Sequence, residues 1–354
     1  MFVLDSHCDT PSQILRLRNL AIDNDHAHVD FPKLKRGGVD GAFFALYIPA
    51  SMEASEAKEY AGKLLDGVHD VLKANSDKAR LALSAEDGYK NQSEGLFSIF
   101  LGLENGSPVT SLDELRGYYD AGVRYMTLCH SADNHICDSC ASAVTKWHGL
   151  SPFGKEVVAE MNRLGMLVDV SHVSDETFYD VIRYSSKPVV ATHSCCRALA
   201  DHPRNLTDDM IRTLADAGGV VQINFYPLFL DDGFGRILEE SGIMKRGEEA
   251  EREFIESPYD SEKRSAWNKI QDELQALERP SFTKIADHID HVVSLAGIDH
   301  VGIGSDFDGI EITPSGLEDI SLLPKLFDEL RKRGYSESDI SKVAGLNFFR
   351  IMNA

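Results

Sequence analysis

The sequence predicts a single (β/α)8 barrel, the TIM-barrel form of the α/β class, on three observations. Eight short apolar runs recur along the chain, amphipathic helical segments separate them, and charged or imidazole side chains follow most of the runs. Strands that alternate with helices lie parallel and are joined by right-handed crossovers. Eight such units favour a closed barrel over the alternative, an open doubly wound sheet.

The expected strands are short and rich in β-branched and aromatic residues, and they are Phe2–Leu4, Gly41–Tyr47, Leu96–Leu103, Tyr125–Leu128, Leu167–Val170, Val189–Ala191, Gly219–Ile223 and Val301–Gly304. The clearest helical segments between them are Ala54–Ala74, Ser111–Ala121, Phe153–Leu164, Asp175–Tyr184 and Thr207–Ala217. Ser111 with Glu114, and more weakly Ser336 with Asp339, have the spacing of a capping box at a helix start.

One highly charged segment, Asp231–Arg279, departs from this alternation. It has helical spacing around Trp267, Ile270, Leu274 and Leu277. We expect a solvated helical excursion after the seventh strand, with a wall at the barrel mouth or a dimer contact as the alternative. Because no Pro/Gly-rich linker marks a second domain, residues 1–354 are expected to form one barrel domain.

Composition excludes several classes of protein. The net charge of -21, from 36 Lys and Arg against 57 Asp and Glu, argues against a nucleic-acid or anionic-membrane partner. No apolar run reaches the roughly 18 residues of a membrane span. The N-terminus lacks the basic region and long apolar core of a signal peptide, so a cytoplasmic protein is expected. The six cysteines are then expected to be thiols, with Cys137 and Cys140 a plain loop pair.

The positions of polar residues point to chemistry at one end of the barrel. Six of the eight strands deliver His, Asp or Glu at their carboxyl ends, which is the end where barrel enzymes place their active sites. In chain order these residues are Asp5, His7 and Asp9, then Glu104, His130, Asp169 and His172, then His193, Asp306 and Asp308.

Imidazole and carboxylate ligands together favour Zn²⁺, with Mn²⁺, Fe²⁺ and Co²⁺ as alternatives. His7 and Asp9 are two residues apart, so both face the same way on a continuing strand. His172 and His193 come from neighbouring strands and can meet across the barrel mouth. Glu104 is the natural candidate to bridge two ions.

Other interpretations stay open for several of these residues. Asp169 is either a ligand, a helix cap or a partner that holds a ligand histidine. Asp308 is expected to hydrogen-bond the turn in which it sits. A lone histidine is more often a hydrogen-bonded loop residue than a ligand, and this group comprises His26, His28, His69, His148, His202, His288, His291 and His300.

Eight ordered motifs that span almost the whole chain carry a family resemblance: Asp5–Pro11, Gly102–Gly106, Gly122–His130, Asp169–Ser174, Thr192–Ser194, Arg204–Leu206, Gly302–Gly309 and Gly345–Ile351. With them, the chain resembles the renal (membrane) dipeptidase family, binuclear zinc peptidases on an amidohydrolase-type barrel. The resemblance implies two zinc ions per chain. His7 and Asp9 would hold one ion, His172 and His193 the other, and Glu104 would bridge both.

The resemblance also implies how the substrate is handled. Arg204 would bind the free C-terminal carboxylate of a dipeptide, and His130 the scissile carbonyl or its oxyanion. Asp306 would exchange protons with the attacking water, a hydroxide held between the ions, and with the leaving amine. The family's membrane-attached members carry a signal peptide and a lipid-anchor tail, which this chain lacks, so a soluble homodimer acting on small dipeptides is expected.

Two rival functions share these residues. The first is another amide hydrolysis of the amidohydrolase type, on an N-acyl amino acid or a lactam, because fold and metals do not select the substrate. The second, less favoured, is a catalytically silent metal- or peptide-binding protein. A serine hydrolase is disfavoured because the Gly-x-Ser-x-Gly elbow is absent from the sequence.

Overall fold

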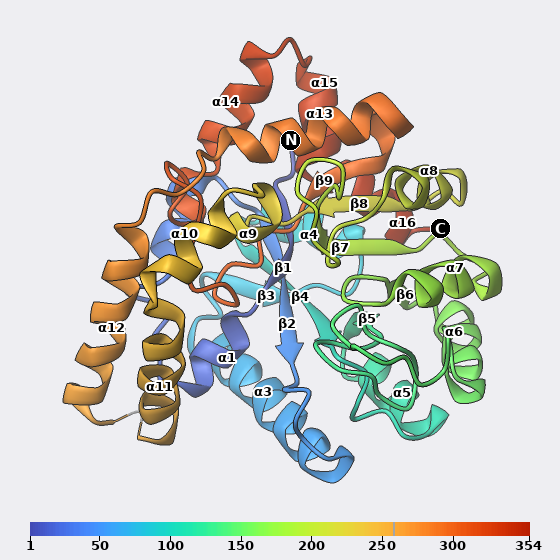
Figure 1. The fold of residues 1–354 in the computed structure, drawn as a ribbon, viewed down its shortest axis with the longest axis horizontal. Helices are drawn as coiled ribbons and strands as arrows, with labels where there is room; N and C mark the ends of the chain where they lie inside the picture. Colours follow the sequence, from blue (N-terminus) through green and yellow to red (C-terminus); the bar gives the residue numbers. More distant parts are fainter. Residues whose placement is uncertain (258) are drawn as a thin grey trace.

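The computed structural model describes residues 1–257 and 259–354, and these form a parallel barrel surrounded by helices (Figure 1). The strands are β1 (Leu4–Cys8), β2 (Gly41–Tyr47), β3 (Ala79–Leu81), β4 (Phe97–Glu104), β5 (Val123–Thr127), β6 (Leu167–Asp169), β7 (Val190–Ser194), β8 (Val220–Ile223) and β9 (Val301–Ile303). Eight of them follow the order β1-β2-β4-β5-β6-β7-β8-β9, and β3 pairs only with β4, off this path.

The last strand returns to the first and nearly closes the barrel. Cys8 forms a parallel bridge with Phe307 just beyond β9, and the N–H of Asp9 donates to the carbonyl of Phe307 at 2.9 Å. The N–H of Asp306 donates to the carbonyl of His7 at 3.0 Å. The (β/α)8 barrel that the alternation predicted is therefore confirmed, and the open doubly wound sheet is not formed.

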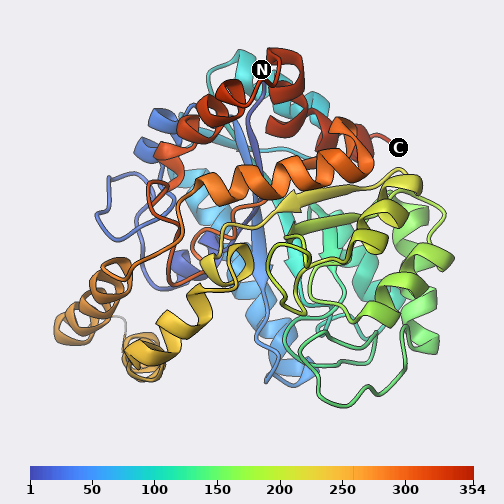
Figure 2. The same ribbon diagram turned by 45° about the horizontal axis from the view of Figure 1, so that its top comes forward.

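Helices cover the outside of the barrel, as Figure 2 shows from a second direction. They are α1 (Thr10–Leu15), α2 (Phe31–Gly37), α3 (Ala54–Ala74), α4 (Ala85–Ser93), α5 (Leu112–Asp120), α6 (Pro152–Leu164), α7 (Asp175–Tyr184), α8 (Asp208–Asp216), α9 (Pro227–Leu230), α10 (Phe234–Ser241), α11 (Ile243–Glu256), α12 (Ser261–Gln275), α13 (Thr283–Ala296), α14 (Pro324–Lys332), α15 (Glu337–Ser341) and α16 (Asn347–Met352). Both expected capping boxes form, at Ser111 with Glu114 and at Ser336 with Asp339.

All eight expected strands are present, and two details differ. The first strand runs from Leu4 to Cys8 rather than from Phe2 to Leu4. Its polar residues continue the strand because they are buried at the barrel mouth, and a search for apolar runs ends at the first of them. The additional strand β3 was not predicted, since it is only three residues long and contains Arg80.

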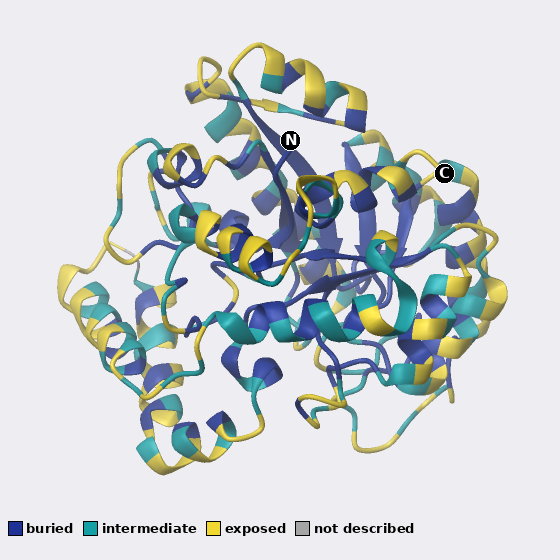
Figure 3. Cartoon of the chain, turned by 90° about the horizontal axis from the view of Figure 1, so that it is seen from above, coloured by how far each residue is buried: buried dark blue, intermediate teal, exposed yellow. Residues whose placement is uncertain are grey.

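The barrel interior has an apolar floor and a polar upper layer. Alternate residues of each strand point inward. The floor is filled by inward side chains of seven strands and by the C-terminal helix: Leu4, Phe43, Phe100, Tyr125, Leu167, Val190, Val220, Phe348 and Phe349. Two residues further along their strands come Thr127, Asp169 and Thr192, and Glu104 lies four residues after Phe100; all four polar residues are buried. The strands in Figure 3 are correspondingly dark. The polar layer at the barrel mouth therefore lies on an apolar floor that excludes water.

The charged segment after β8 is helical, as expected, and forms α10, α11 and α12. These helices lie beside the barrel at the left of Figures 1 and 2. They have a small apolar core of their own, in which Phe234, Phe254, Trp267, Ile270 and Leu274 are buried. None of the described helices has the length and apolar character needed to cross a membrane.

Candidate metal and catalytic site

Glu104, the last residue of β4, is the centre of a buried polar cluster at the barrel mouth. Its Oε1 lies 3.2 Å from Nε2 of His172 and 3.5 Å from Nε2 of His193. Its Oε2 lies 3.4 Å from Nε2 of His7. The two oxygens of one carboxylate thus face different imidazoles, which is the placement that a bridging ligand requires.

The remaining acids join the cluster through His7. Nε2 of His7 lies 3.5 Å from Oδ2 of Asp9 and 4.0 Å from Oδ1 of Asp306. Potential ligand atoms within 4.8 Å of one another form three groups, namely His7 with Glu104 and His193, Glu104 with His130 and His172, and His7 with Asp9 and Asp306. The structure therefore brings together all five sequence-predicted ligands, with His130 and Asp306 beside them.

This donor set fits divalent cations. Nε2 of His7 and Oδ1 of Asp9 are buried and have no hydrogen-bond partner among the described residues. Nε2 of His172 and Nε2 of His193 lie 2.9 Å apart and face each other. Buried polar atoms are normally paired, and imidazole with carboxylate is the ligand chemistry of zinc and similar metals. Bound cations would satisfy these atoms together.

Burial sets the protonation of the cluster. It lowers the pKa values of His172 and His193 well below the usual histidine value, and the Arg204 charge adds to this, so both imidazoles are neutral with lone pairs available. Burial also raises the pKa of Asp9 to about 7, and repulsion from Glu104 acts in the same direction. A cation bound between the carboxylates of the cluster would thus strongly stabilise their charged forms.

Outer partners orient the histidines. Nδ1 of His7 lies 2.8 Å from Oη of Tyr125, and Nδ1 of His193 lies 2.8 Å from Oγ1 of Thr192. The Thr192 hydroxyl donates to Asp169 at 2.6 Å. Asp169 belongs to none of the three ligand groups. Of its open interpretations, the structure favours the one in which it holds a ligand histidine, here through Thr192.

Two residues of the site have left-handed backbones. His172 has a φ of 70° and Asp306 a φ of 64°. Non-glycine residues in this region cost on the order of 1–3 kcal/mol and persist where surrounding contacts fix them. Both follow strand ends, so the sharp turn is what aims their side chains back into the barrel mouth.

Arg204 is buried beside the proposed ligand His193. Its Nη2 donates to the His193 carbonyl at 3.0 Å, its Nη1 donates to Oγ of Ser194 at 3.3 Å, and its guanidinium lies over the Phe229 ring at 5.4 Å. Its Nε has no hydrogen-bond partner among the described residues. A fixed guanidinium next to the cluster suits the recognition of a carboxylate.

His130 lies beside the cluster and contacts both Glu104 and His172. Its Nε2 is 3.7 Å from Oε1 of Glu104, and its ring packs at a tilt against His172 at 4.1 Å and edge-on against Tyr47 at 4.8 Å. Burial, with the Arg204 charge, lowers the pKa of His130 to about 4, so the ring is neutral at pH 7. A neutral imidazole can donate one N–H to a carbonyl oxygen.

Asp306 is held by a residue that the sequence interpretation missed. Asn224, directly after β8, donates its side-chain N–H to Oδ2 of Asp306 at 2.9 Å. Burial raises the pKa of Asp306, and Asp9 raises it further, so this carboxyl binds a proton more readily than usual. Tyr47 was missed in the same way. Tyr47 is the last residue of β2 and Asn224 follows β8, the two expected strands that no His, Asp or Glu follows. Extending the positional rule to any polar residue would have found both.

Asp308 does not act within its own turn, contrary to the expectation. Its carboxylate accepts hydrogen bonds from the Thr10 hydroxyl, from Arg18 and from the backbone N–H of His28. It therefore ties the segment after β1 to the turn after β9. All six cysteines, including Cys137 and Cys140, are free thiols, as expected.

Comparisons with known proteins agree with this arrangement. The family described as "Membrane dipeptidase (Peptidase family M19)" matches residues 1–354. Dipeptidase verJ of Clonostachys rogersoniana is 34% identical over 357 residues, which cover 97% of this chain and 79% of the relative. The crystal structure of the probable dipeptidase PvdM from Pseudomonas aeruginosa is similar with a TM-score of 0.83 and 27% identity, covering 99% of this chain and 94% of that one.

A second crystal structure, that of dipeptidase AC, a metallopeptidase, has a TM-score of 0.81 and 26% identity, covering 100% of this chain and 98% of the other. The resemblance carried by the ordered motifs is thus confirmed over the whole chain. The protein is a metallo-dipeptidase and belongs to the membrane dipeptidase family, peptidase family M19.

Proposed function

We propose that the protein is a zinc-dependent dipeptidase that binds two zinc ions per chain and cleaves dipeptides with a free C-terminal carboxylate. The observation that carries this proposal is the position of Arg204. Its guanidinium donates to the backbone of His193, a proposed metal ligand. A carboxylate bound there would lie close to the reacting centre, which limits the chain length between the scissile bond and the C-terminus.

Five side chains would hold the metal ions. His7 and Asp9 would bind one ion, and His172 and His193 the other. Glu104 would bridge the two ions, because its Oε2 faces His7 and its Oε1 faces His172 and His193. When bound, zinc lowers the pKa of water to about 7 and polarises the scissile carbonyl.

Three further residues of the chain act on the substrate. Arg204 orients the dipeptide by its carboxylate. His130, kept neutral by burial, donates an N–H to the carbonyl oxygen as negative charge develops there. Asp306, whose orientation is fixed by Asn224, takes a proton from the attacking water and returns it to the leaving amine.

A three-substrate comparison on zinc-loaded protein tests this function. We expect hydrolysis of alanyl-alanine and a loss of at least about tenfold in kcat/KM for alanyl-alanine amide, because the amide removes the charged partner of Arg204. We expect slower hydrolysis of N-acetylalanine, the N-acyl amino acid substrate of the rival function.

The Arg204→Lys variant is the matched control. It keeps the positive charge but not the planar pair of donors, so it should raise KM for alanyl-alanine more than it changes the rate on the amide. Equal rates on dipeptide and amide in the wild-type protein, or faster hydrolysis of N-acetylalanine than of any dipeptide, would contradict the proposal.

A further inference from the structure

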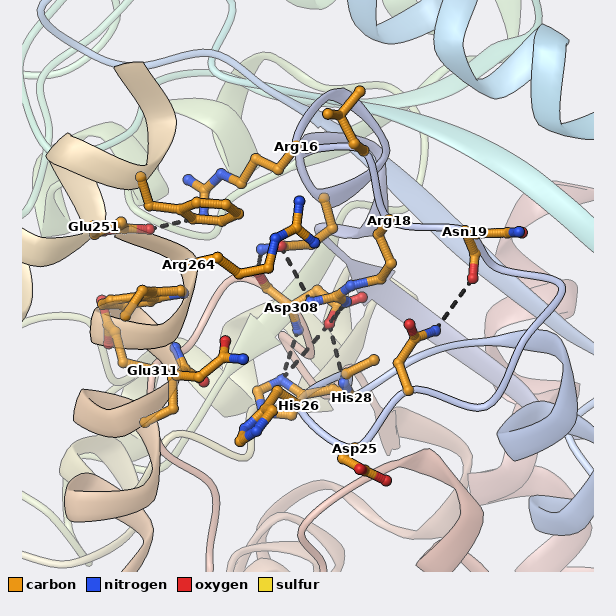
Figure 4. A pocket seen from close by; sticks show the side chains of 18 of the residues that line it. Arg16, Arg18, Asn19, Asp25, His26, His28, Glu251, Arg264, Asp308 and Glu311 are labelled. Carbon is orange, nitrogen blue, oxygen red and sulfur yellow. Dashed lines mark hydrogen bonds and ion pairs between the residues drawn. The ribbon is translucent and has the colours of Figure 1, made fainter. Parts of the chain in front are cut away.

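A polar cavity of about 420 Å³ lies beside the barrel mouth and has no part in the chemistry described above (Figure 4). Three parts of the chain line it: the segment after β1, helices α11 and α12, and the turn after β9. The excursion that departs from the barrel alternation thus forms one wall of the cavity. This matches the alternative that the sequence left open for it, a wall at the barrel mouth.

The cavity adjoins the metal cluster on its Asp9 and Asp306 side. Gly309 lines the cavity, and a Cβ at this position would lie 2.1 Å from Oδ2 of Asp9 and 2.8 Å from Oδ1 of Asp306. Arg204 is held on the His193 side of the cluster. A dipeptide with its carboxylate at Arg204 and its scissile bond over the cluster would therefore direct its N-terminal residue toward the cavity.

Two of the three arginines that line the cavity form ion pairs, and the third, Arg264, lies over the Phe254 ring at 5.2 Å. Arg16 forms an ion pair with Glu251 at 2.8 Å, and Arg18 forms one with Asp308 at 2.5 Å. Figure 4 shows Asp308 and Arg18 at the centre of the view, and Arg16 reaching Glu251. An anionic ligand at Arg16 or Arg18 would have to break one of these pairs, so these two arginines do not favour an anion.

Glu311 is the carboxyl group of the wall that has acids for neighbours. It accepts a hydrogen bond from the Tyr226 phenol, and the charged groups that act most on it are Glu251 and Asp306. Burial, together with these two carboxylates, raises the pKa of Glu311 to about 7. A cation that entered the cavity would relieve this repulsion and would form a charge-assisted hydrogen bond.

We propose that the cavity binds the side chain of the substrate's N-terminal residue and that Glu311 selects a long side chain ending in an ammonium or guanidinium group. This inference rests on the proposed dipeptidase function. The volume of the cavity is far larger than a methyl side chain needs and falls within the range of small-molecule sites.

Kinetics on two matched dipeptides test the proposal. Lysyl-alanine and norleucyl-alanine share the α-amine and the length of the alkyl chain, and differ in the terminal ammonium. We expect wild-type zinc-loaded protein to prefer lysyl-alanine by about tenfold or more in kcat/KM, since a hydrogen bond between charged groups contributes roughly 1.5–3 kcal/mol. The Glu311→Gln variant should bring this ratio close to one, and Tyr226→Phe should reduce it partly.

The Asp25→Asn variant is the control, because Asp25 is an exposed carboxylate on the rim of the same cavity. It should keep the wild-type ratio. A wild-type ratio near one, or a ratio that Asp25→Asn lowers as much as Glu311→Gln does, would overturn the proposal. Equal losses on both dipeptides in Glu311→Gln would also overturn it, since they would indicate a structural role.

Calorimetric binding of the same two dipeptides to metal-depleted protein separates this inference from the proposed function. Tighter, Glu311-dependent binding of lysyl-alanine without any dipeptide hydrolysis by the zinc-loaded protein would support the cavity assignment and refute the dipeptidase. Hydrolysis of both dipeptides, with equal binding of the two, would support the dipeptidase and refute the cavity assignment.

Discussion

Tyr125 Oη lies 2.8 Å from Nδ1 of His7, and this contact joins the apolar floor of the barrel to the metal cluster. The Tyr125 ring packs among the floor residues, against Phe43 at 5.1 Å. It occupies the space above Gly102, where a Cβ would lie 2.2 Å from the ring. Because Nε2 of His7 faces Glu104, Nδ1 must carry the proton when a metal binds, and it then donates to Tyr125.

The Tyr125→Phe variant should weaken metal binding. It removes the acceptor that fixes the His7 tautomer, and outer partners of this kind typically change metal affinity by about 10–100-fold. Competition with a chelator measures the affinity directly, without relying on turnover. Tyr89→Phe, which alters a partly exposed tyrosine at the floor of the barrel, should leave the affinity unchanged. Equal affinities of Tyr125→Phe and wild-type protein would contradict this role for the hydroxyl.

The Asp306→Asn variant separates a proton-transfer role from a ligand role. Asp306 belongs to one of the three groups of potential ligand atoms, so both are geometrically possible. If it transfers protons, the variant should retain its zinc and lose about 10²–10⁴-fold in kcat. Zinc content and kcat are measured on the same sample. Loss of one zinc ion would assign Asp306 as a ligand, and near wild-type kcat with full zinc would exclude the proton role.

The polar ends of the strands were predictable, and the partners around them were less so. Glu104 and His193 stand at strand ends, and position along the chain is enough to place them at the barrel mouth. Asn224 and Tyr47 stand at equivalent positions, but their residue types do not signal metal chemistry. That Asp169 acts through Thr192 depends on hydrogen bonds across two strands, which spacing alone does not specify.

The cavity could not be predicted, because its walls come from distant parts of the chain. Glu311 and Glu251 approach each other only after the excursion folds back against the turn after β9. The sequence indicated that the excursion is helical, from the spacing of Trp267 and Ile270. Which of its faces meets the barrel depends on contacts such as the ion pair between Arg16 and Glu251.

A buried histidine away from the metal cluster should make stability depend on pH. His288 in α13 accepts a hydrogen bond from the Cys196 N–H at 3.0 Å and donates to the Leu230 carbonyl at 3.2 Å, so it is neutral. Burial lowers its pKa from 6.5 to about 4. Between these values the unfolded chain binds a proton that the folded chain does not, so stability falls as pH falls through this window.

The His288→Gln variant should therefore lose less stability on acidification. Denaturant unfolding at pH 7 and pH 5, with zinc present throughout, should show the free energy of unfolding falling by about 1–2 kcal/mol more in wild-type protein than in the variant. His69→Gln, at an exposed position of α3, serves as the control and should follow the wild-type curve. Parallel curves for wild type and His288→Gln would show that His288 does not remain neutral on folding.

Titration of metal-depleted protein with zinc tests the central claim most directly. Bound zinc and the rate of alanyl-alanine hydrolysis are followed together in the wild-type protein and in Glu104→Gln. The two-metal dipeptidase predicts tight binding of two zinc ions per chain, full activity only when the second is bound, and loss of both binding and activity in Glu104→Gln. Full activity with one zinc ion or none, or a fully active Glu104→Gln variant, would contradict it.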